Sequence, residues 1–133
     1  MDFNIIKIYS MWNLKKLIVS TILFIAIDAM YLYSSKKTFE DQIVKVQRVI
    51  MQMRWEGALL CYLVLVFGIN YFIIQPRKSV YDAFLLGVVI YAVYETTNYA
   101  TLKKWSEYMV ITDSLWGGIL FAITTYLTYE ITK

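Results

Sequence analysis

The chain has 133 residues, of which 59% are hydrophobic and 17% are charged, and its formal net charge is +3. A soluble domain usually has about 45–50% apolar and about 25% charged residues, so this composition indicates a membrane protein. The lack of histidine excludes histidine-based catalysis and most zinc and haem sites. The single cysteine excludes a disulfide framework, and the scattered basic residues do not favour nucleic-acid binding.

Hydrophobic segments recur along the whole chain. They cover about residues 17–34, 56–75, 80–102 and 108–131, and none of them contains a lysine or an arginine. Each reaches the length of about 20 residues that crosses a hydrocarbon core, and none alternates as the strands of a barrel do. The sequence therefore predicts an all-α fold, a transmembrane four-helix bundle that forms a single multi-pass membrane domain over residues 1–133. A soluble bundle of very apolar helices is the alternative, but the absence of basic residues inside the segments speaks against it.

The connections between these segments differ in length. Residues 76–79 and 103–107 form short links, so we expect sequential helices to be antiparallel neighbours. Lysines and arginines are distributed almost evenly between the two ends of the bundle, and the positive-inside rule predicts no orientation.

The longer link between the first two helices contains an amphipathic segment at about residues 38–54. Thr38 and Asp41 fit a capping box that would begin a new helix. Apolar residues then recur at helical spacing, at Ile43, Val46, Ile50 and Met53. This pattern is typical of a helix on the membrane surface, of an extension of the second helix, or of a stripe that packs against the end of the bundle.

Acidic side chains occur inside three of the predicted spans. From the rise of about 1.5 Å per residue, Asp28, Glu95 and Asp113 each lie about 9–12 Å from the same end of the bundle. Glu56 opens the second helix at the rim of that end, whereas Asp82 belongs to the opposite end as an interfacial acid. Because charged groups inside a membrane are costly and usually face the bundle interior, we predict a shared acidic site.

Helical spacing adds further polar residues to this predicted site. Tyr91, Glu95 and Asn98 follow one another at intervals of four and three, and Tyr94 is four residues from Asn98. These side chains would form one wall of the site.

Other residues have simpler interpretations. Trp105 and Tyr108 are typical of aromatic anchors at the membrane interface. Asn70, near the opposite end, is predicted to hydrogen-bond between helices, and the pair Gly117–Gly118 to allow close helix contact. The half of the bundle away from the acids is expected to be apolar.

The motifs around these acids resemble those of a family of predicted membrane proteins, domain-of-unknown-function family 2177. The strongest likeness lies in the third helix, with Glu95 where the family has aspartate, and includes Gly87, Tyr91, Tyr94, Thr97, Asn98, Ala100, Thr101, Leu102 and Trp105. Shorter matches are Asp28 and Leu32 in the first helix, with Tyr31 where the family has tryptophan, and Asp113, Trp116 and Gly117 in the fourth. The resemblance covers about residues 15–125 and implies four membrane helices, but it does not extend to Glu56 and implies no activity.

The residues support several functional hypotheses. In the first, the polar cluster binds or conducts a cation or a proton, as in ion transport. In the second, the same groups are hydrogen-bonded contacts that fix the helices of a structural or assembly component. In the third, the cluster belongs to a lipid-modifying enzyme at the membrane face, with Arg54, Lys103 and Lys104 near headgroup phosphates. No motif of a known nucleophile supports the enzyme hypothesis.

Few cofactors and partners are predicted. No cofactor is evident, although carboxylates near a membrane face could hold an oxygen-ligated divalent cation such as Mg²⁺ or Mn²⁺. The lipid bilayer is the predicted partner, and a bundle this small is a candidate for homo-oligomers or contacts with other membrane proteins.

Overall fold

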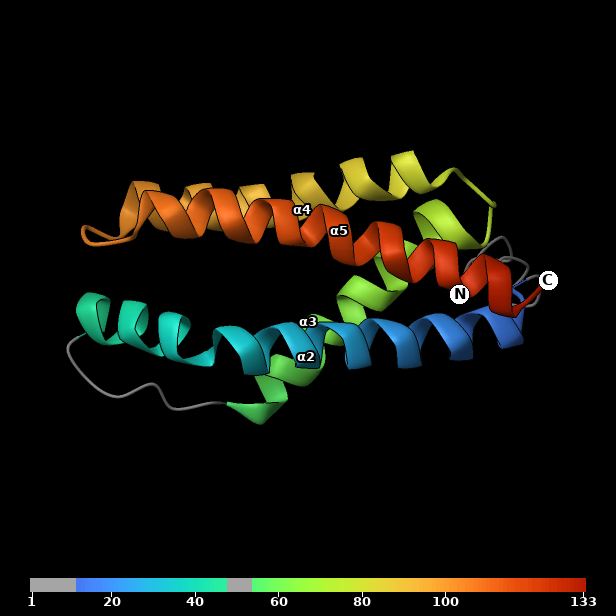
Figure 1. Ribbon diagram of the computed structural model, residues 1–133, viewed down its shortest axis with the longest axis horizontal. Coiled ribbons are helices and arrows are strands. Elements are labelled where there is room, and N and C mark those ends of the chain that lie inside the picture. Colours follow the sequence, from blue (N-terminus) through green and yellow to red (C-terminus); the bar gives the residue numbers. More distant parts are fainter. Residues whose placement is uncertain (1–11, 48–53) are drawn as a thin grey trace, which may run out of the picture.

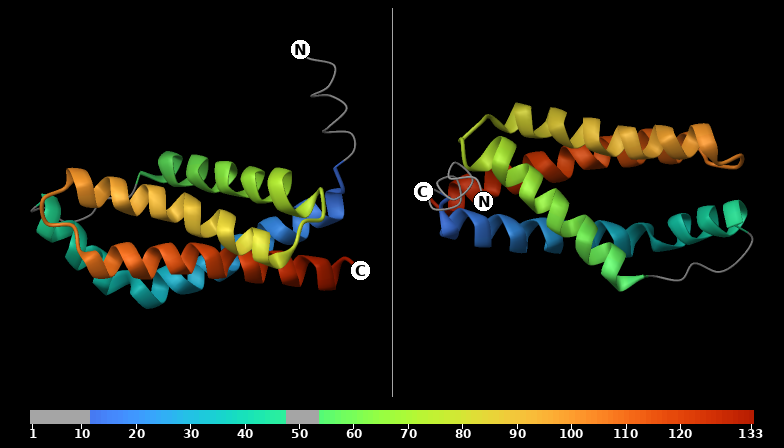
Figure 2. Two further views of the ribbon diagram at one scale, coloured as in Figure 1. Left: turned by 90° about the horizontal axis from the view of Figure 1, so that it is seen from above. Right: turned by 180° about the vertical axis from the view of Figure 1, so that it is seen from behind.

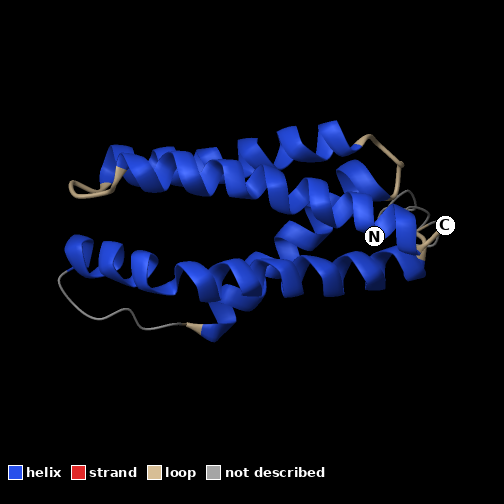
Figure 3. Cartoon of the chain, viewed as in Figure 1, coloured by secondary structure: helices blue, strands red, loops and turns tan. Residues whose placement is uncertain are grey.

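The computed structural model describes residues 12–47 and 54–133, and these residues form helices without any strand (Figures 1 and 3). The helix labels follow Figure 1. In chain order the elements are α2 (Leu14–Gln47), α3 (Trp55–Ile69), the π-helical turn η1 (Asn70–Ile74), α4 (Val80–Thr101) and α5 (Glu107–Ile131). The predicted all-α architecture is confirmed.

Among the described residues, four helical segments are long and apolar enough to cross a membrane. They are Leu14–Val46, Trp55–Ile74, Val80–Thr101 and Glu107–Ile131. Large apolar side chains such as Leu63, Val89 and Leu115 are exposed on their outer faces, as expected for side chains that contact lipid. The predicted multi-pass arrangement is therefore confirmed by the helices themselves.

The first helix continues through the segment that was predicted to be separate. A single α-helix runs from Leu14 to Gln47, so Thr38 lies inside it and begins no new helix. The stretch around Ser34 contains no glycine or proline, and the Ser34 hydroxyl donates to the Met30 carbonyl within the helix. At about 1.5 Å per residue the helix is about 50 Å long and extends beyond a hydrocarbon core of about 30 Å.

The C-terminal extension of α2 is attached to the α4–α5 loop. Gln42 is buried and its side-chain amide donates to the carbonyl of Lys104, with a distance of 2.7 Å. The amphipathic segment therefore extends the first helix rather than the second. Ile50 and Met53, the last positions of the predicted stripe, lie outside the described residues.

The closest helix pair is α4 and α5, which run side by side in opposite directions (Figure 2). Glycines permit this approach, because a Cβ atom on Gly87 would collide with the backbone of Gly117, and one on Gly118 would meet the side chains of Val88 and Phe84. The predicted close contact at Gly117–Gly118 is confirmed. Although they are distant in sequence, α2 and α5 also pack together, and α3 runs obliquely across the bundle (Figure 2).

The half of the bundle away from the acids is not purely apolar. Asn70 is fully buried at the start of the π-helical turn, where its amide donates to the Ser20 hydroxyl of α2 (3.1 Å). Gln75 in turn donates to the Asn70 side-chain oxygen (3.1 Å). The interhelical bond predicted for Asn70 is confirmed, but the expectation of an apolar half is wrong. Three fully buried threonines of α5 also contradict it, namely Thr124, Thr125 and Thr128.

Candidate functional site

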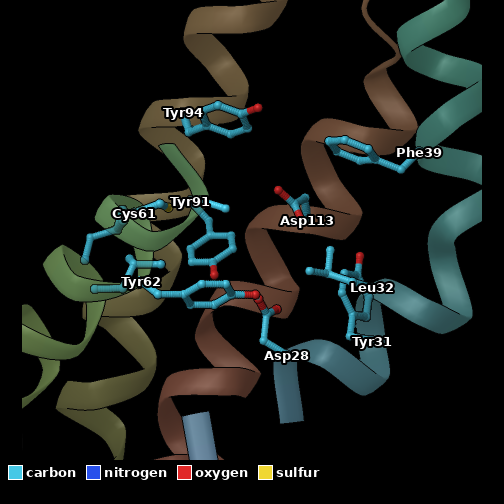
Figure 4. Close-up of a pocket in the computed structure, with 12 residues that line it drawn as sticks. Asp28, Tyr31, Leu32, Phe39, Cys61, Tyr62, Tyr91, Tyr94 and Asp113 are labelled. Atoms are coloured by element: carbon cyan, nitrogen blue, oxygen red, sulfur yellow. The ribbon is translucent and has the colours of Figure 1, made fainter. Parts of the chain in front are cut away.

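A cavity of about 340 Å³ lies between the helices, with residues of α2, α3, α4 and α5 in its wall (Figure 4). The wall is largely aromatic and aliphatic, and two carboxyl groups reach it. The lining residues are Asp28, Tyr31, Leu32, Phe39, Ala58, Cys61, Tyr62, Leu65, Ile90, Tyr91, Tyr94 and Asp113. Within residues 12–47 and 54–133, no basic residue lines this cavity.

Asp28 of α2 is held by donors from two other helices. The Tyr62 hydroxyl of α3 donates to one carboxyl oxygen at 2.5 Å, and the Trp116 indole of α5 donates to the other at 3.0 Å. The indole ring also stacks on Tyr31, with ring centroids 4.2 Å apart. Because both oxygens of this buried carboxyl accept a hydrogen bond, Asp28 links three helices and is compensated within the protein.

Glu95 of α4 is fully buried but only half satisfied. The Trp105 indole donates to its Oε2 atom at 2.7 Å, whereas no group of the described residues donates to Oε1. The prediction that Trp105 is an interfacial anchor is wrong, because this side chain is buried and turned toward Glu95. Tyr108, by contrast, is 66% exposed, as an anchor would be.

Asp113 of α5 lies next to Glu95, within hydrogen-bonding reach of its side chain. No N–H or O–H group of the described residues donates to the Asp113 carboxyl. Two carboxylates cannot both be charged at such a short separation in a dry site unless a proton or a cation lies between them. The Glu95–Asp113 pair therefore differs from Asp28, whose compensation is complete.

Asp113 also borders a second cavity of about 80 Å³ between α2 and α5. The two cavities share Tyr31, Leu32, Phe39 and Asp113. The smaller one has hydroxyl groups in its wall, from Ser35, Thr38, Thr112 and Tyr108. Thr38 and Tyr108 are exposed, so this second cavity extends toward the outside of the bundle.

The remaining predicted site residues differ in whether they line the main cavity. Tyr91 and Tyr94 line the main cavity, and Asn98 lies beside Tyr94, within reach of its hydroxyl, but outside the lining. Glu56 is exposed in the first turn of α3 and does not line the cavity. Asp82 is exposed in the first turn of α4, at the other end of the bundle, in agreement with its predicted place.

The arrangement of the acids does not favour a metal site. Within residues 12–47 and 54–133, no three histidine, cysteine, aspartate or glutamate side chains are grouped so that they could hold a metal ion. Asp28 and Asp113 face the same cavity, but Asp28 accepts from Tyr62 and Trp116, whereas Glu95 of the acid pair accepts from Trp105.

Several residues of the cavity were not predicted from the sequence, and three of them carry an aromatic ring or a thiol. Tyr62, Phe39 and Cys61 lie in apolar or amphipathic runs, where the sequence gives no sign of their neighbours. Trp116 was expected only as a motif residue, and its position three residues after Asp113 did not indicate that it would bond Asp28 instead.

Substitution of Trp105 with phenylalanine is expected to lower the free energy of unfolding by about 1–2 kcal/mol, since Glu95 loses its indole donor while burial is retained. Denaturant titration in mixed micelles would measure this change. Trp55→Phe is the matched control, because Trp55 is 75% exposed and should give no measurable change. Equal stability of the two variants would contradict the importance of the Trp105–Glu95 bond.

The apolar helices of the described residues, packed around a cavity with buried acids, define the chain as a multi-pass integral membrane protein. Residues 13–131 match the family described as "Predicted membrane protein (DUF2177)", and the chain belongs to that family. No curated protein and no solved structure matches the chain. The family description gives no activity, so a function has to be inferred from the site.

Proposed function

We propose that the Glu95–Asp113 pair binds a proton that it exchanges for a cation, and that this exchange is the function of the site. The observation that carries the proposal is the fully buried Oε1 atom of Glu95, which has no donor among the described residues, together with the Asp113 carboxyl, which lies within hydrogen-bonding reach of the Glu95 side chain. A shared proton or a cation would satisfy both acids at once. Intramembrane carboxyl groups with this kind of deficit commonly serve ion or proton paths.

Access to the pair supports the same proposal. Asp113 borders both cavities, and the smaller one has hydroxyl groups that can pass a proton toward the exposed Tyr108 and Thr38. Glu95 is closed off behind Asp113 and is held in place by Trp105. In this arrangement Asp113 is the exchanging group and Glu95 is its fixed partner.

A structural role is favoured for Asp28 alone. Both of its oxygens accept hydrogen bonds from other helices, so its carboxyl group is compensated within the protein. A component whose only role is to hold a membrane assembly together would have all of its buried acids compensated in this way, which the Glu95–Asp113 pair is not.

The test is the pH dependence of stability in lipid nanodiscs. The folded pair would keep a proton that the unfolded chain releases, so the melting temperature is expected to fall as the pH rises, and a bound cation should offset the fall. Asp113→Asn and Glu95→Gln each remove one charge of the pair while preserving side-chain shape. Each variant should weaken both the dependence of the melting temperature on pH and its dependence on the bound cation. Asp82→Asn is the control, because Asp82 is an exposed acid at the other end of α4.

An unchanged dependence on pH and on cations would contradict the proposed exchange. If wild type and the two pair variants show the same dependence on pH and on added Na⁺, K⁺ or Mg²⁺ as Asp82→Asn, the pair exchanges nothing and the proposal is wrong.

A further inference from the structure

The main cavity is much larger than an inorganic ion requires. Its volume of about 340 Å³ lies at the lower end of the range of about 300–1,000 Å³ found for small-molecule sites. Its wall is formed mainly by rings and aliphatic groups, which cannot replace the water shell of a metal ion. A ligand that fills this cavity must therefore offer an apolar surface.

The polar groups of the wall determine the charge of that ligand. Among the described residues, Asp28 and Asp113 are the charged ones that line the cavity, and no basic side chain of this part of the chain lines it. Since both Asp28 oxygens already accept hydrogen bonds, Asp113 has the free acceptor atoms. Figure 4 shows Asp113 between Tyr91 and Tyr94 on one side and Leu32 and Phe39 on the other.

Aromatic rings add a second attraction for positive charge. The faces of tyrosine and phenylalanine rings carry negative potential, and a ring of such side chains is a common site for organic ammonium groups. Here the ring-bearing residues of the wall come from all of α2, α3 and α4, namely Tyr31, Phe39, Tyr62, Tyr91 and Tyr94.

From the size, apolar wall and acidic groups of this cavity, we infer that it binds an amphiphilic organic cation, an amine or quaternary ammonium compound with an apolar body. The cationic group lies beside Asp113, and the apolar body contacts the rings of α3 and α4. This inference rests on the proposed function in one respect, because the cation takes the place of the proton that Asp113 shares with Glu95. It adds the class of ligand, which the acid pair alone does not determine.

The test compares two probes of the same shape. Benzyltrimethylammonium carries a positive charge, and neopentylbenzene has a carbon atom in place of the nitrogen. Binding to the full-length protein in lipid nanodiscs is measured by displacement of a fluorescent ammonium dye and by proton release. The charged probe is expected to bind at least about tenfold more tightly than the neutral probe and to release protons.

Variants then locate the binding site. Asp113→Asn is expected to weaken binding of the charged probe about tenfold and to abolish proton release. Tyr94→Leu should weaken it about three- to fivefold, whereas Tyr94→Phe, which keeps the ring, should bind like wild type. Asp82→Asn should also bind like wild type, because Asp82 is remote from the cavity.

Failure of this inference differs from failure of the proposed function. If the two probes bind equally well, or if neither binds while stability still depends on the acid pair, the organic-cation inference is wrong and the exchange of a proton for an inorganic ion remains. If the charged probe binds in wild type and equally well in Asp113→Asn, the cavity does not use Asp113, and the inference is overturned. Tight binding that depends on Asp113 and on the Tyr94 ring would establish it.

Discussion

Replacement of Gly87 with alanine is expected to lower the free energy of unfolding by about 2–3 kcal/mol. The added Cβ atom would meet the carbonyl oxygen of Gly117, and it would lie 2.7 Å from the Gly117 carbonyl carbon and 2.9 Å from the Phe121 ring. Because two of these contacts are with backbone, a side-chain rotation cannot relieve them. The α4–α5 pair must separate instead, and its close packing is lost along the interface.

The same substitution at Gly68 is the matched control. A Cβ atom there has no neighbour within 4 Å, and alanine is the better helix former by about 1 kcal/mol. Gly68→Ala should therefore be neutral or slightly stabilising in the same denaturant titration. If the two glycine variants were equally stable, the contact between α4 and α5 would have to be looser than the structure indicates.

Removal of the Asp28 side chain is expected to lower the free energy of unfolding by about 1–4 kcal/mol. Asp28→Ala leaves the Tyr62 hydroxyl and the Trp116 indole without their acceptor, and hydrogen bonds to a charged group are worth about 1.5–3 kcal/mol in soluble proteins. Membrane proteins often show smaller values, of about 0.6 kcal/mol per bond on average, which sets the lower end of the expected range.

Double-mutant cycles separate the two bonds. Tyr62→Phe and Trp116→Phe each remove one donor and keep an aromatic ring, so each should couple with Asp28→Ala by about 1 kcal/mol or more. Tyr33→Phe provides a comparison, because Tyr33 is 84% exposed on the same helix. Additive losses in both cycles would show that Asp28 does not link α2 to α3 and α5.

Gly87 and Asp28, the residues of these two predictions, lie in the helices that also position the Glu95–Asp113 pair. The close approach of α4 and α5 brings Asp113 next to Glu95, and the bonds of Asp28 hold α2 and α3 against that helix pair. The helices are fixed by compensated polar groups, while the uncompensated pair lies between them. Variants that loosen the helices should therefore also change the proton exchange that we propose for the pair, whereas Asp113→Asn should change this exchange with little loss of stability.

Much of the fold follows from the sequence. Apolar segments of sufficient length, without lysine or arginine, can satisfy their backbone in a membrane only as helices, so the number and type of spans are determined locally. The rise of an α-helix places acids by depth, which is how Asp28, Glu95 and Asp113 were predicted near one end. The break before Thr38 was wrong, because a capping pattern does not end a helix in which the preceding residues remain helical.

The partners of the acids were decided only by the tertiary structure. Depth along a helix says nothing about rotation around it, and rotation determines that Tyr62 and Trp116 meet Asp28. Trp105, whose position at a loop is typical of an interfacial anchor, turns inward because the α4–α5 turn carries its indole back to Glu95. By itself the sequence determined which residues are costly to bury. The packing of the helices decided which of them are compensated, since hydrogen bonds between helices depend on side chains that are distant along the chain.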